Sequence, residues 1–190
     1  YAKGGADDLL VQITAINRGL EEAELHLLPT LWFRNDWAAW IARPAETKPN
    51  LQQIKGPAGT SAVAAVHPVV GEFTLSCEGD VPLLFTDNET NYERVFGTPN
   101  QTPYVKDGIN NCVVLGQQEA VNPEKTGTKV AAHYRFNIGP GQSATVRLRL
   151  TAPAAAVKSR KTKAAATPFG PEFDQTLAAR LQEADEFYQS

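Results

Sequence analysis

Short runs of alternating apolar and polar residues, each followed by a turn signal, constrain the fold of this chain more than any other feature. The first run, Leu9–Ile16, has the period of a half-buried strand and is followed by Asn17, Arg18 and Gly19. Further runs of strand-like composition are Glu24–Leu28, Leu51–Lys55, Ala62–His67, Glu72–Cys77, Pro82–Phe85, Lys129–Asn137 and Ser143–Thr151. Because no helical pattern alternates with these runs, they favour an antiparallel sandwich over a parallel α/β sheet. We therefore predict a mostly β chain that forms an antiparallel β-sandwich over residues 1–152.

Two of the turns predict hairpins. The turn at Asn17–Gly19 would pair Leu9–Ile16 with Glu24–Leu28. The Gly- and Pro-rich segment Ile138–Gln142 would pair Lys129–Asn137 with Ser143–Thr151.

The C-terminal part of the chain changes character twice. Residues 153–168 are rich in Ala, Lys and Arg, which predicts a surface loop or linker whose cations are solvated. Residues 169–190 carry apolar side chains at helical spacing, at Phe173, Leu177, Leu181, Ala184 and Phe187. This segment is predicted to form an amphipathic helix, and acidic residues near its end suggest that the helix continues past Ser190.

Composition narrows the class of protein. At 190 residues and 42% hydrophobic content, the chain can bury one sizeable core. The net charge of −3 gives no basic footprint for a nucleic acid or a membrane surface. The two cysteines, Cys77 and Cys112, are too few for a disulfide-stapled scaffold, and we expect both to be reduced, buried and structural.

The run from Phe85 to Asn110 is the most distinctive polar segment. It concentrates Asn, Asp, Glu, Arg and Lys between two strand-like runs, and its aromatic residues Tyr92, Phe96 and Tyr104 argue against disorder. Ordered loops of this length inside a compact domain are usually functional. We refer to the part of this run from Asn88 to Asn110 as the polar loop.

The polar loop, together with Leu25–Trp37, Ala120–Tyr134 and Pro168–Tyr188, resembles the N-terminal β-rich domain of bacterial glucosidase-like glycoside hydrolases of family 63. The resemblance implies a supersandwich-like domain, with a first strand or strands missing, and a helical linker into a catalytic (α/α)6 barrel beyond Ser190. It places both catalytic carboxylates of an inverting α-glucosidase in that barrel. The chain is then a noncatalytic domain of a bacterial, cytoplasmic enzyme, with the barrel of the same polypeptide as its partner and no cofactor.

Catalysis by this chain itself is the competing hypothesis. Glycoside hydrolysis needs two carboxyl groups, and Glu89, Glu93 and Asp107 are candidates in the polar loop. Carboxylates next to Arg94 or Lys106 are more often structural ion pairs. His26, His67 and His133 are isolated in separate strand-like runs, so no metal site is predicted.

The resemblance makes the polar loop a candidate interface with the barrel and a rim of its substrate entrance. The candidate interface residues are Arg34, Asn35, Glu89, Asn91, Glu93, Arg94, Tyr104, Lys106, Asp107 and Asn110. In the simpler interpretation, Asn88, Asn91 and Asn100 only shape the loop through local hydrogen bonds.

Two further functions stay open. Trp37 and Trp40 could form an aromatic platform for an oligosaccharide, whereas Trp32 is expected to belong to the sandwich core. The chain would then be a carbohydrate-binding module. Alternatively it is a plain protein-interaction sandwich, and unpaired sheet edges would favour its self-association.

Overall fold

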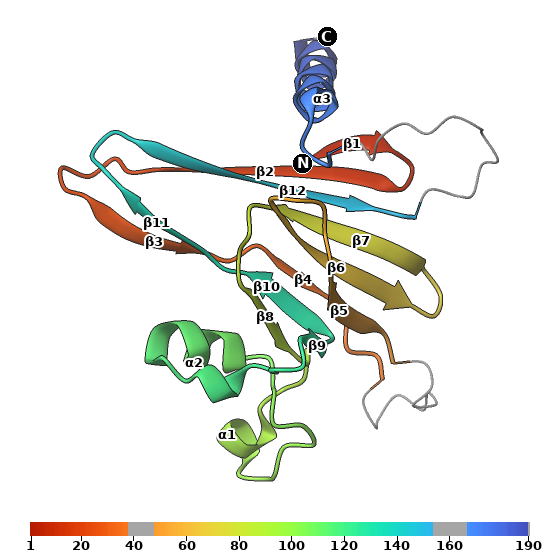
Figure 1. The fold of residues 1–190 in the computed structure, drawn as a ribbon, viewed down its shortest axis with the longest axis vertical. Helices are drawn as coiled ribbons and strands as arrows, with labels where there is room; N and C mark the ends of the chain where they lie inside the picture. The colour runs from red at the N-terminus through yellow and green to blue at the C-terminus, as the bar shows by residue number, and fades with distance from the viewer. Residues whose placement is uncertain (38–47, 154–166, 190) are drawn as a thin grey trace.

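The computed structural model describes residues 1–37, 48–153 and 167–189, and shows two layers of antiparallel strands with helices at the two ends (Figure 1). The larger layer is a seven-stranded sheet in the order β1-β2-β12-β7-β6-β5-β9. Its strands are β1 (Ala2–Gly5), β2 (Asp8–Ile16), β5 (Asn50–Ile54), β6 (Thr60–His67), β7 (Gly71–Glu78), β9 (Thr126–Gly127) and β12 (Ser143–Thr151). The predicted mostly β, antiparallel fold is therefore confirmed.

The second layer consists of two smaller sheets. A three-stranded sheet has the order β4-β10-β8, and β11 pairs with β3 in a two-stranded sheet. The bounds are Ala23–Leu27 for β3, Thr30–Trp32 for β4, Leu83–Thr86 for β8, Lys129–Ala132 for β10 and Tyr134–Ile138 for β11. The predicted single strand Lys129–Asn137 is thus interrupted at His133, whose N–H donates to the carbonyl of Pro82 at 2.9 Å.

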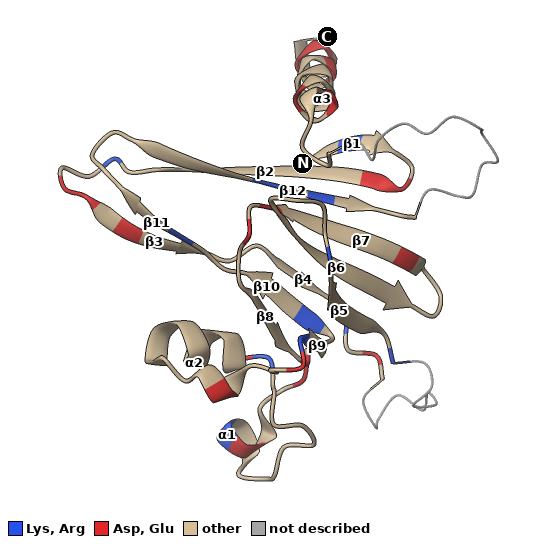
Figure 2. Ribbon diagram, viewed as in Figure 1, with Lys and Arg blue, Asp and Glu red and all other residues tan. Residues whose placement is uncertain are grey.

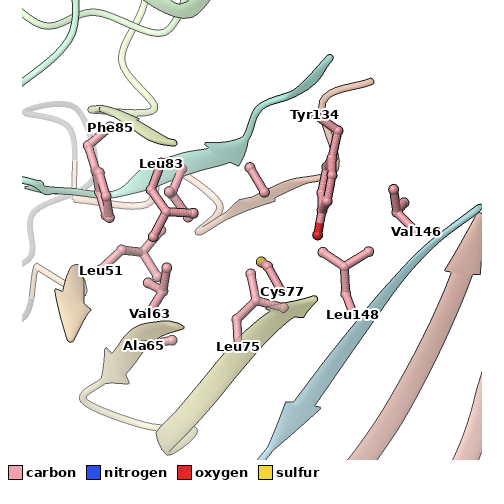
Figure 3. Close-up of a cluster of buried hydrophobic side chains, with 12 residues drawn as sticks. Leu51, Val63, Ala65, Leu75, Cys77, Leu83, Phe85, Tyr134, Val146 and Leu148 are labelled. Carbon is pink, nitrogen blue, oxygen red and sulfur yellow. The ribbon is translucent and has the colours of Figure 1, made fainter. Parts of the chain in front are cut away.

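The hydrophobic core lies between the two layers (Figure 3). Cys77 of β7 faces Tyr134 of β11 across it, and Leu51 of β5 faces Phe85 of β8. The Tyr134 hydroxyl donates to the carbonyl of Glu78 at 2.8 Å, which satisfies the one polar group of a buried ring. Both cysteines are free and buried, as predicted, and burial raises the pKa of the Cys77 thiol to about 12.

Both predicted hairpins are wrong. The strand β2 pairs with β1 and β12, whereas β3 pairs with β11. The two turns instead lie against each other: Asn17 N–H donates to Gln142 O, and Gly141 N–H donates to Asn17 O, each at 2.9 Å. The Asn17 side chain also donates to the carbonyl of Ile138 at 2.7 Å. Each turn therefore carries the chain from one layer to the other, and does not fold a strand back onto its neighbour.

Several short elements give no strong sequence signal. They are the strands β1, β4 and β9, the helices α1 (Tyr92–Phe96) and α2 (Gly108–Leu115), and a 3₁₀ turn at Gln118–Ala120. The helix α2 covers the outer side of the three-stranded sheet, where Ile109 and Cys112 pack against Leu84 and Ala131. The outer face of this sheet is thus a second, smaller core.

The helix α3 (Pro171–Gln189) joins the outer face of the large sheet through its first turns (Figure 1). Phe173 is fully buried against Ala2 and Leu10. The guanidinium of Arg147 lies 5.4 Å from the centre of the Phe173 ring and forms a 3.2 Å ion pair with Asp174. Farther along the predicted apolar stripe, Leu181 is 65% exposed, so the described residues cover only the beginning of that stripe.

A second ion pair supports the same junction. The Arg149 guanidinium donates twice to the Asp8 carboxylate, at 2.7 and 2.8 Å, and once to the carbonyl of Pro168 at 3.2 Å. Such fork-to-carboxylate contacts fix geometry as well as charge. The start of α3 is thereby tied to the edge of the sheet.

His26 and His133 are not isolated, contrary to the sequence expectation. Nε2 of His133 lies 3.0 Å from Nδ1 of His26, and Glu24 accepts from the far side of the His26 ring at 3.1 Å and from Arg135. Burial lowers the pKa of His133, and the nearby positive charges of His26 and Arg135 lower it further. The pair therefore favours a neutral His133.

We expect Phe173→Ala to destabilise the protein by about 3–5 kcal/mol, because it removes a fully buried ring and leaves a cavity at the helix junction. The matched control Leu181→Ala, on the exposed part of the same helix, should change the free energy of unfolding by no more than about 0.5 kcal/mol. Urea unfolding followed by circular dichroism measures both. Equal losses in the two variants would contradict the described packing of α3.

The His26–His133 pair predicts a stability loss in mild acid. Because the folded-state pKa of His133 is lower than its unfolded value of 6.5, the unfolded chain binds more protons below that pH. This contribution to stability is present above pH 6.5 and is lost as the pH falls through the folded-state pKa. The slope of unfolding free energy against pH between about 5 and 7 should therefore be smaller in His133→Gln than in the wild type. Identical slopes would show that the pair does not couple to folding.

Candidate functional site

The polar loop starts at the end of β8, and its two ends are held together by backbone hydrogen bonds. Asp87 N–H donates to Tyr104 O at 2.7 Å, and Lys106 N–H donates to Glu89 O at 3.0 Å. These bonds close the intervening segment into a compact loop that contains α1. The loop is therefore a defined structure at one end of the sandwich, beside α2 (Figure 1).

Asn91 organises the inside of this loop. Its side-chain oxygen accepts from Arg94 N–H at 3.1 Å, which caps the start of α1, and from the Asn100 side chain at 3.0 Å. Its amide nitrogen donates to the Asp107 carboxylate at 3.2 Å. Asn100 in turn accepts from Tyr92 N–H at 2.7 Å. The loop-shaping interpretation therefore holds for Asn91 and Asn100.

The charged side chains of the loop form contacts within it. Arg94 and Asp107 form an ion pair of 3.2 Å, and the Lys106 ammonium donates to the Thr90 hydroxyl at 3.2 Å. Arg94 is 68% exposed, so the pair contributes at most about 1 kcal/mol to stability. The ion pair mainly fixes the position of α1 relative to the start of α2. Figure 2 shows both signs of charge side by side on α1.

A second cluster surrounds Lys48, a residue that the sequence analysis did not single out. Its ammonium lies 3.2 Å from the Asp87 carboxylate and 3.3 Å from that of Glu89, and both acidic side chains are 16% exposed. Trp37 Nε1 donates to Glu89 at 3.1 Å, and the Lys48 ammonium lies 5.7 Å from the centre of the Trp37 ring. We call Trp37, Lys48, Asp87 and Glu89 the Lys48 cluster. The sequence gives no signal for this cluster, because Lys48 and Asp87 lie far apart along the chain and meet only in the folded protein.

Asn35 and Asn88 connect residues 33–37 to the polar loop. Asn88 donates from its side chain to Phe33 O at 2.9 Å, and Asn35 donates to Asn88 O at 3.2 Å. The Thr128 hydroxyl accepts from Asn88 N–H at 2.8 Å and donates to Asp87 at 3.2 Å. The buried Oδ1 of Asn35 has no hydrogen-bond partner among the described residues. An unsatisfied buried acceptor of this kind marks a place where a further donor would be favourable.

The structure brings together most of the predicted site residues. Glu89, Asn91, Arg94, Lys106 and Asp107 meet inside the polar loop, and Asn35 and Trp37 join at its Glu89 end. The remaining candidates are more peripheral: Arg34, Glu93 and Asn110 are exposed and Tyr104 is half-buried. Trp40 lies outside the described residues.

The expectation for Trp32 is wrong. Its side chain is 56% exposed, whereas the neighbouring Leu31 packs against the core. Successive side chains of a strand point to opposite faces, and Leu31 pairs with the buried Val130, so Trp32 must face outward beside Lys129. Burial lowers the pKa of this lysine, and the charge of Lys106 lowers it further.

Apolar side chains are exposed on α1, which is part of the polar loop, and on α2 at the C-terminal end of the loop. Val95 and Phe96 of α1 are 58% and 64% exposed, and Val114 and Leu115 of α2 are 68% and 62% exposed. The two helices approach each other where Asn91 contacts Asp107, the residue before α2. Since α2 has eight residues and rises about 1.5 Å per residue, its exposed end lies within roughly 12 Å of that contact. We call these four side chains the α1–α2 surface.

A shallow hollow beside α1 has a volume of about 570 Å³. It is lined by Glu93, Gly97, Asn100, Gln101 and Thr102 together with two prolines. Its lining contains none of the tryptophans that the sequence analysis proposed as a sugar platform. The hollow and the Lys48 cluster are thus separate features of the loop.

Among residues 1–37, 48–153 and 167–189, no group of three or more His, Cys, Asp and Glu residues is arranged to hold a metal ion. Within the same ranges, none of the helices has the length and apolar character needed to span a membrane.

No family model matches the sequence. The chain is similar to the uncharacterized protein YMR196W of Saccharomyces cerevisiae, with 33% identity over 204 residues. The match covers 95% of this chain and 18% of the yeast protein. The chain therefore spans less than a fifth of the length of that relative, in which the similar region is one part of a much longer polypeptide.

We expect Asn91→Ala to lower the free energy of unfolding by about 1–2 kcal/mol, because it removes the cap of α1 and leaves Arg94 N–H and Asn100 without their acceptor. Limited proteolysis should then cut within residues 92–100 faster than in the wild type. Asn110→Ala, an exposed asparagine on α2, is the matched control and should change neither property. Unchanged proteolysis of Asn91→Ala would contradict the organising role of this side chain.

Proposed function

We propose that this chain is a noncatalytic domain of a larger, glycoside-hydrolase-like protein, which packs against the catalytic barrel and forms part of the rim of its substrate entrance. The α1–α2 surface next to the rigid polar loop is the observation that carries the proposal. Exposed apolar side chains of this size, bordered by polar groups, are typical of a protein interface.

The internal bonds of the polar loop support a docking role. A loop that is already closed by backbone bonds and capped by Asn91 loses little conformational freedom when it binds. Its ion pair Arg94–Asp107 connects α1 to the residue before α2, and the Lys106 ammonium contacts Thr90.

The comparison with the yeast protein supports the proposal that this chain is part of a longer polypeptide. A region similar to this chain occurs there inside a polypeptide of which it makes up 18%. The proposed activity of the whole protein, hydrolysis of an α-glucosidic bond with inversion by two carboxyl groups of the barrel, rests on the family resemblance alone. Within this chain, Glu89 and Asp107 are engaged by Lys48 and Arg94, which favours structural roles for both carboxylates.

A carbohydrate-binding module is the second candidate. The exposed ring of Trp32 is the observation that favours it, because an open aromatic face suits a sugar ring. Trp37 is less suited, since its indole N–H is bonded to Glu89 and Lys48 lies 5.7 Å from its ring centre. A plain interaction sandwich without any sugar contact would use the same α1–α2 surface with a different partner.

The test uses the full-length polypeptide that contains this domain. Phe96→Asp places a charge in the α1–α2 surface, and Val114→Asp does the same without touching α1. If the surface is buried against the barrel, each variant should lower kcat/KM for an α-glucosidic substrate at least about tenfold, as expected for a residue at the centre of an interface. Val69→Asp, at an exposed apolar position of the β6–β7 turn, is the control and should retain activity.

The outcomes separate the hypotheses. Equal activity of Phe96→Asp, Val114→Asp and Val69→Asp would overturn docking through this surface. Saturable binding of an α-glucan oligosaccharide that is lost in Trp32→Ala would select the carbohydrate-binding function. A wild-type protein without any α-glucosidic activity would overturn the proposed enzyme class.

A further inference from the structure

The outer face of the three-stranded sheet carries a row of three side chains that emerges from under α2. Lys129 of β10 pairs with Thr86 of β8 on one side and with Trp32 of β4 on the other. The neighbouring residues along each strand belong to the core, and side chains alternate, so this row points away from the core. Thr86 is fully buried, Lys129 is half-buried and Trp32 is exposed. The open end of the row is therefore an aromatic ring.

The lysine in the middle of the row is held by neutral groups. Its ammonium donates to the carbonyl of Lys106 at 2.8 Å, and the Lys106 ammonium donates to the Thr90 hydroxyl at 3.2 Å. The Asp107 carboxylate is engaged by Arg94, and neither lysine forms an ion pair with a described residue. Figure 2 marks the positive charge at the start of β10 in blue. Two cations thus lie near the row without a bonded carboxylate.

The electrostatic surroundings of Lys129 favour an added negative charge. Burial lowers the pKa of its ammonium, the charge of Lys106 lowers it further, and Asp107 acts in the opposite direction. Burial and a nearby like charge both raise the free energy of the charged ammonium, and an anion placed beside it lowers that free energy again. A hydrogen bond between an ammonium and an anion is also stronger than one between neutral groups. An anion at this position would therefore be stabilised by both lysines.

We propose that Trp32, Lys129 and Lys106 bind a saccharide that carries a carboxylate or phosphate group. The sugar ring stacks on Trp32, and its anionic group contacts the two ammonium groups. Directly opposed residues of an antiparallel pair have Cβ atoms about 4.5–5.5 Å apart, so one sugar residue on Trp32 brings its substituents within reach of Lys129. The ring thus supplies apolar contact, and the lysines select for negative charge.

The single aromatic ring favours a sugar over a nucleic acid. Proteins that bind single-stranded nucleic acids stack successive bases on several aromatic side chains along a positively charged groove. This row offers one ring, and the net charge of the whole sequence is −3. The inference rests on the carbohydrate-binding candidate given above and adds the charge of the ligand to it. It does not depend on docking through the α1–α2 surface.

Site-resolved lysine acetylation of the full-length polypeptide, followed by peptide mass spectrometry, tests the inference. The probes are glucose 6-phosphate and glucuronate, with glucose as the neutral reference. A bound anion keeps the Lys129 ammonium protonated and covered, so an anionic probe at about ten times its Kd should slow acetylation of Lys129 roughly tenfold. Glucose should have no such effect at the same concentration, and Lys55, an exposed lysine outside the row, should react at an unchanged rate. Unchanged acetylation of Lys129 with both anionic probes would overturn the inference.

A pair of aromatic variants checks the role of the ring. Trp32→Ala removes an exposed side chain, so the domain should stay folded while the protection of Lys129 by the anionic sugars is lost. Tyr188→Ala, at an exposed aromatic position of α3, should leave the protection intact. Protection that survives Trp32→Ala, or that inorganic phosphate gives equally well, would overturn the sugar site. Protection by AMP without protection by either anionic sugar would assign a nucleotide and also overturn it.

The outcomes also separate this inference from the proposed functions. Saturable binding of a neutral α-glucan oligosaccharide that is lost in Trp32→Ala, with no protection of Lys129 by the anionic sugars, would keep the carbohydrate-binding function and reject the anionic ligand. Protection of Lys129 by an anionic sugar together with fully active Phe96→Asp and Val114→Asp variants would reject the α1–α2 surface and support this inference.

Discussion

The pairing of β2 with β12 is the interaction on which the rest of the structure depends. All nine residues of β2 pair with all nine residues of β12. The alternate side chains of this ribbon serve two different cores. Val146 and Leu148 point inward to the sandwich, whereas Leu10 points outward and contacts Phe173 of α3. One ladder thereby positions both the main core and the C-terminal helix.

The two ends of the molecule are stabilised by different physical means. At the α3 end, a buried ring and two arginine–carboxylate contacts join a helix to a sheet. At the polar-loop end, the order comes from amide side chains that satisfy backbone groups, with Asn91 and Asn100 at the centre. Hydrogen bonds of this local kind specify geometry strongly while each contributes only about 1 kcal/mol. The loop can therefore present a fixed surface without a core of its own.

The sequence predicted where strands lie better than which strands pair. Alternation of side chains located β2, β6, β7 and β12 to within a few residues, because burial of one face leaves a period of two in the sequence. Pairing failed because Asn17 reads as a hairpin turn but binds Ile138 and Gln142, more than a hundred positions away. A turn signal shows that the chain changes direction. Long-range contacts then determine which strand the next strand pairs with.

Only part of the candidate site was predicted, because a sequence pattern identifies residues that lie close together along the chain. Asn91, Arg94 and Asp107 are close in sequence, so the polar composition of their segment identified them together. Lys48 was missed because it reaches Asp87 and Glu89 only through the fold. Trp32 was misplaced by a shift of one position, which in a strand exchanges the buried face for the exposed one.

The separation of β2 and β12 along the chain also determines how the protein can be made. Thr14 and Thr145, whose hydroxyls meet at 2.9 Å, are 131 positions apart. At a synthesis rate of about 5–20 residues per second, a ribosome needs on the order of ten seconds to deliver β12 after β2 has emerged. During that interval the apolar rows of β2 have no partner strand on the β12 side, and folding of the sandwich must wait for the last strand. The β2 side of the large sheet is therefore completed only when synthesis has passed Thr151.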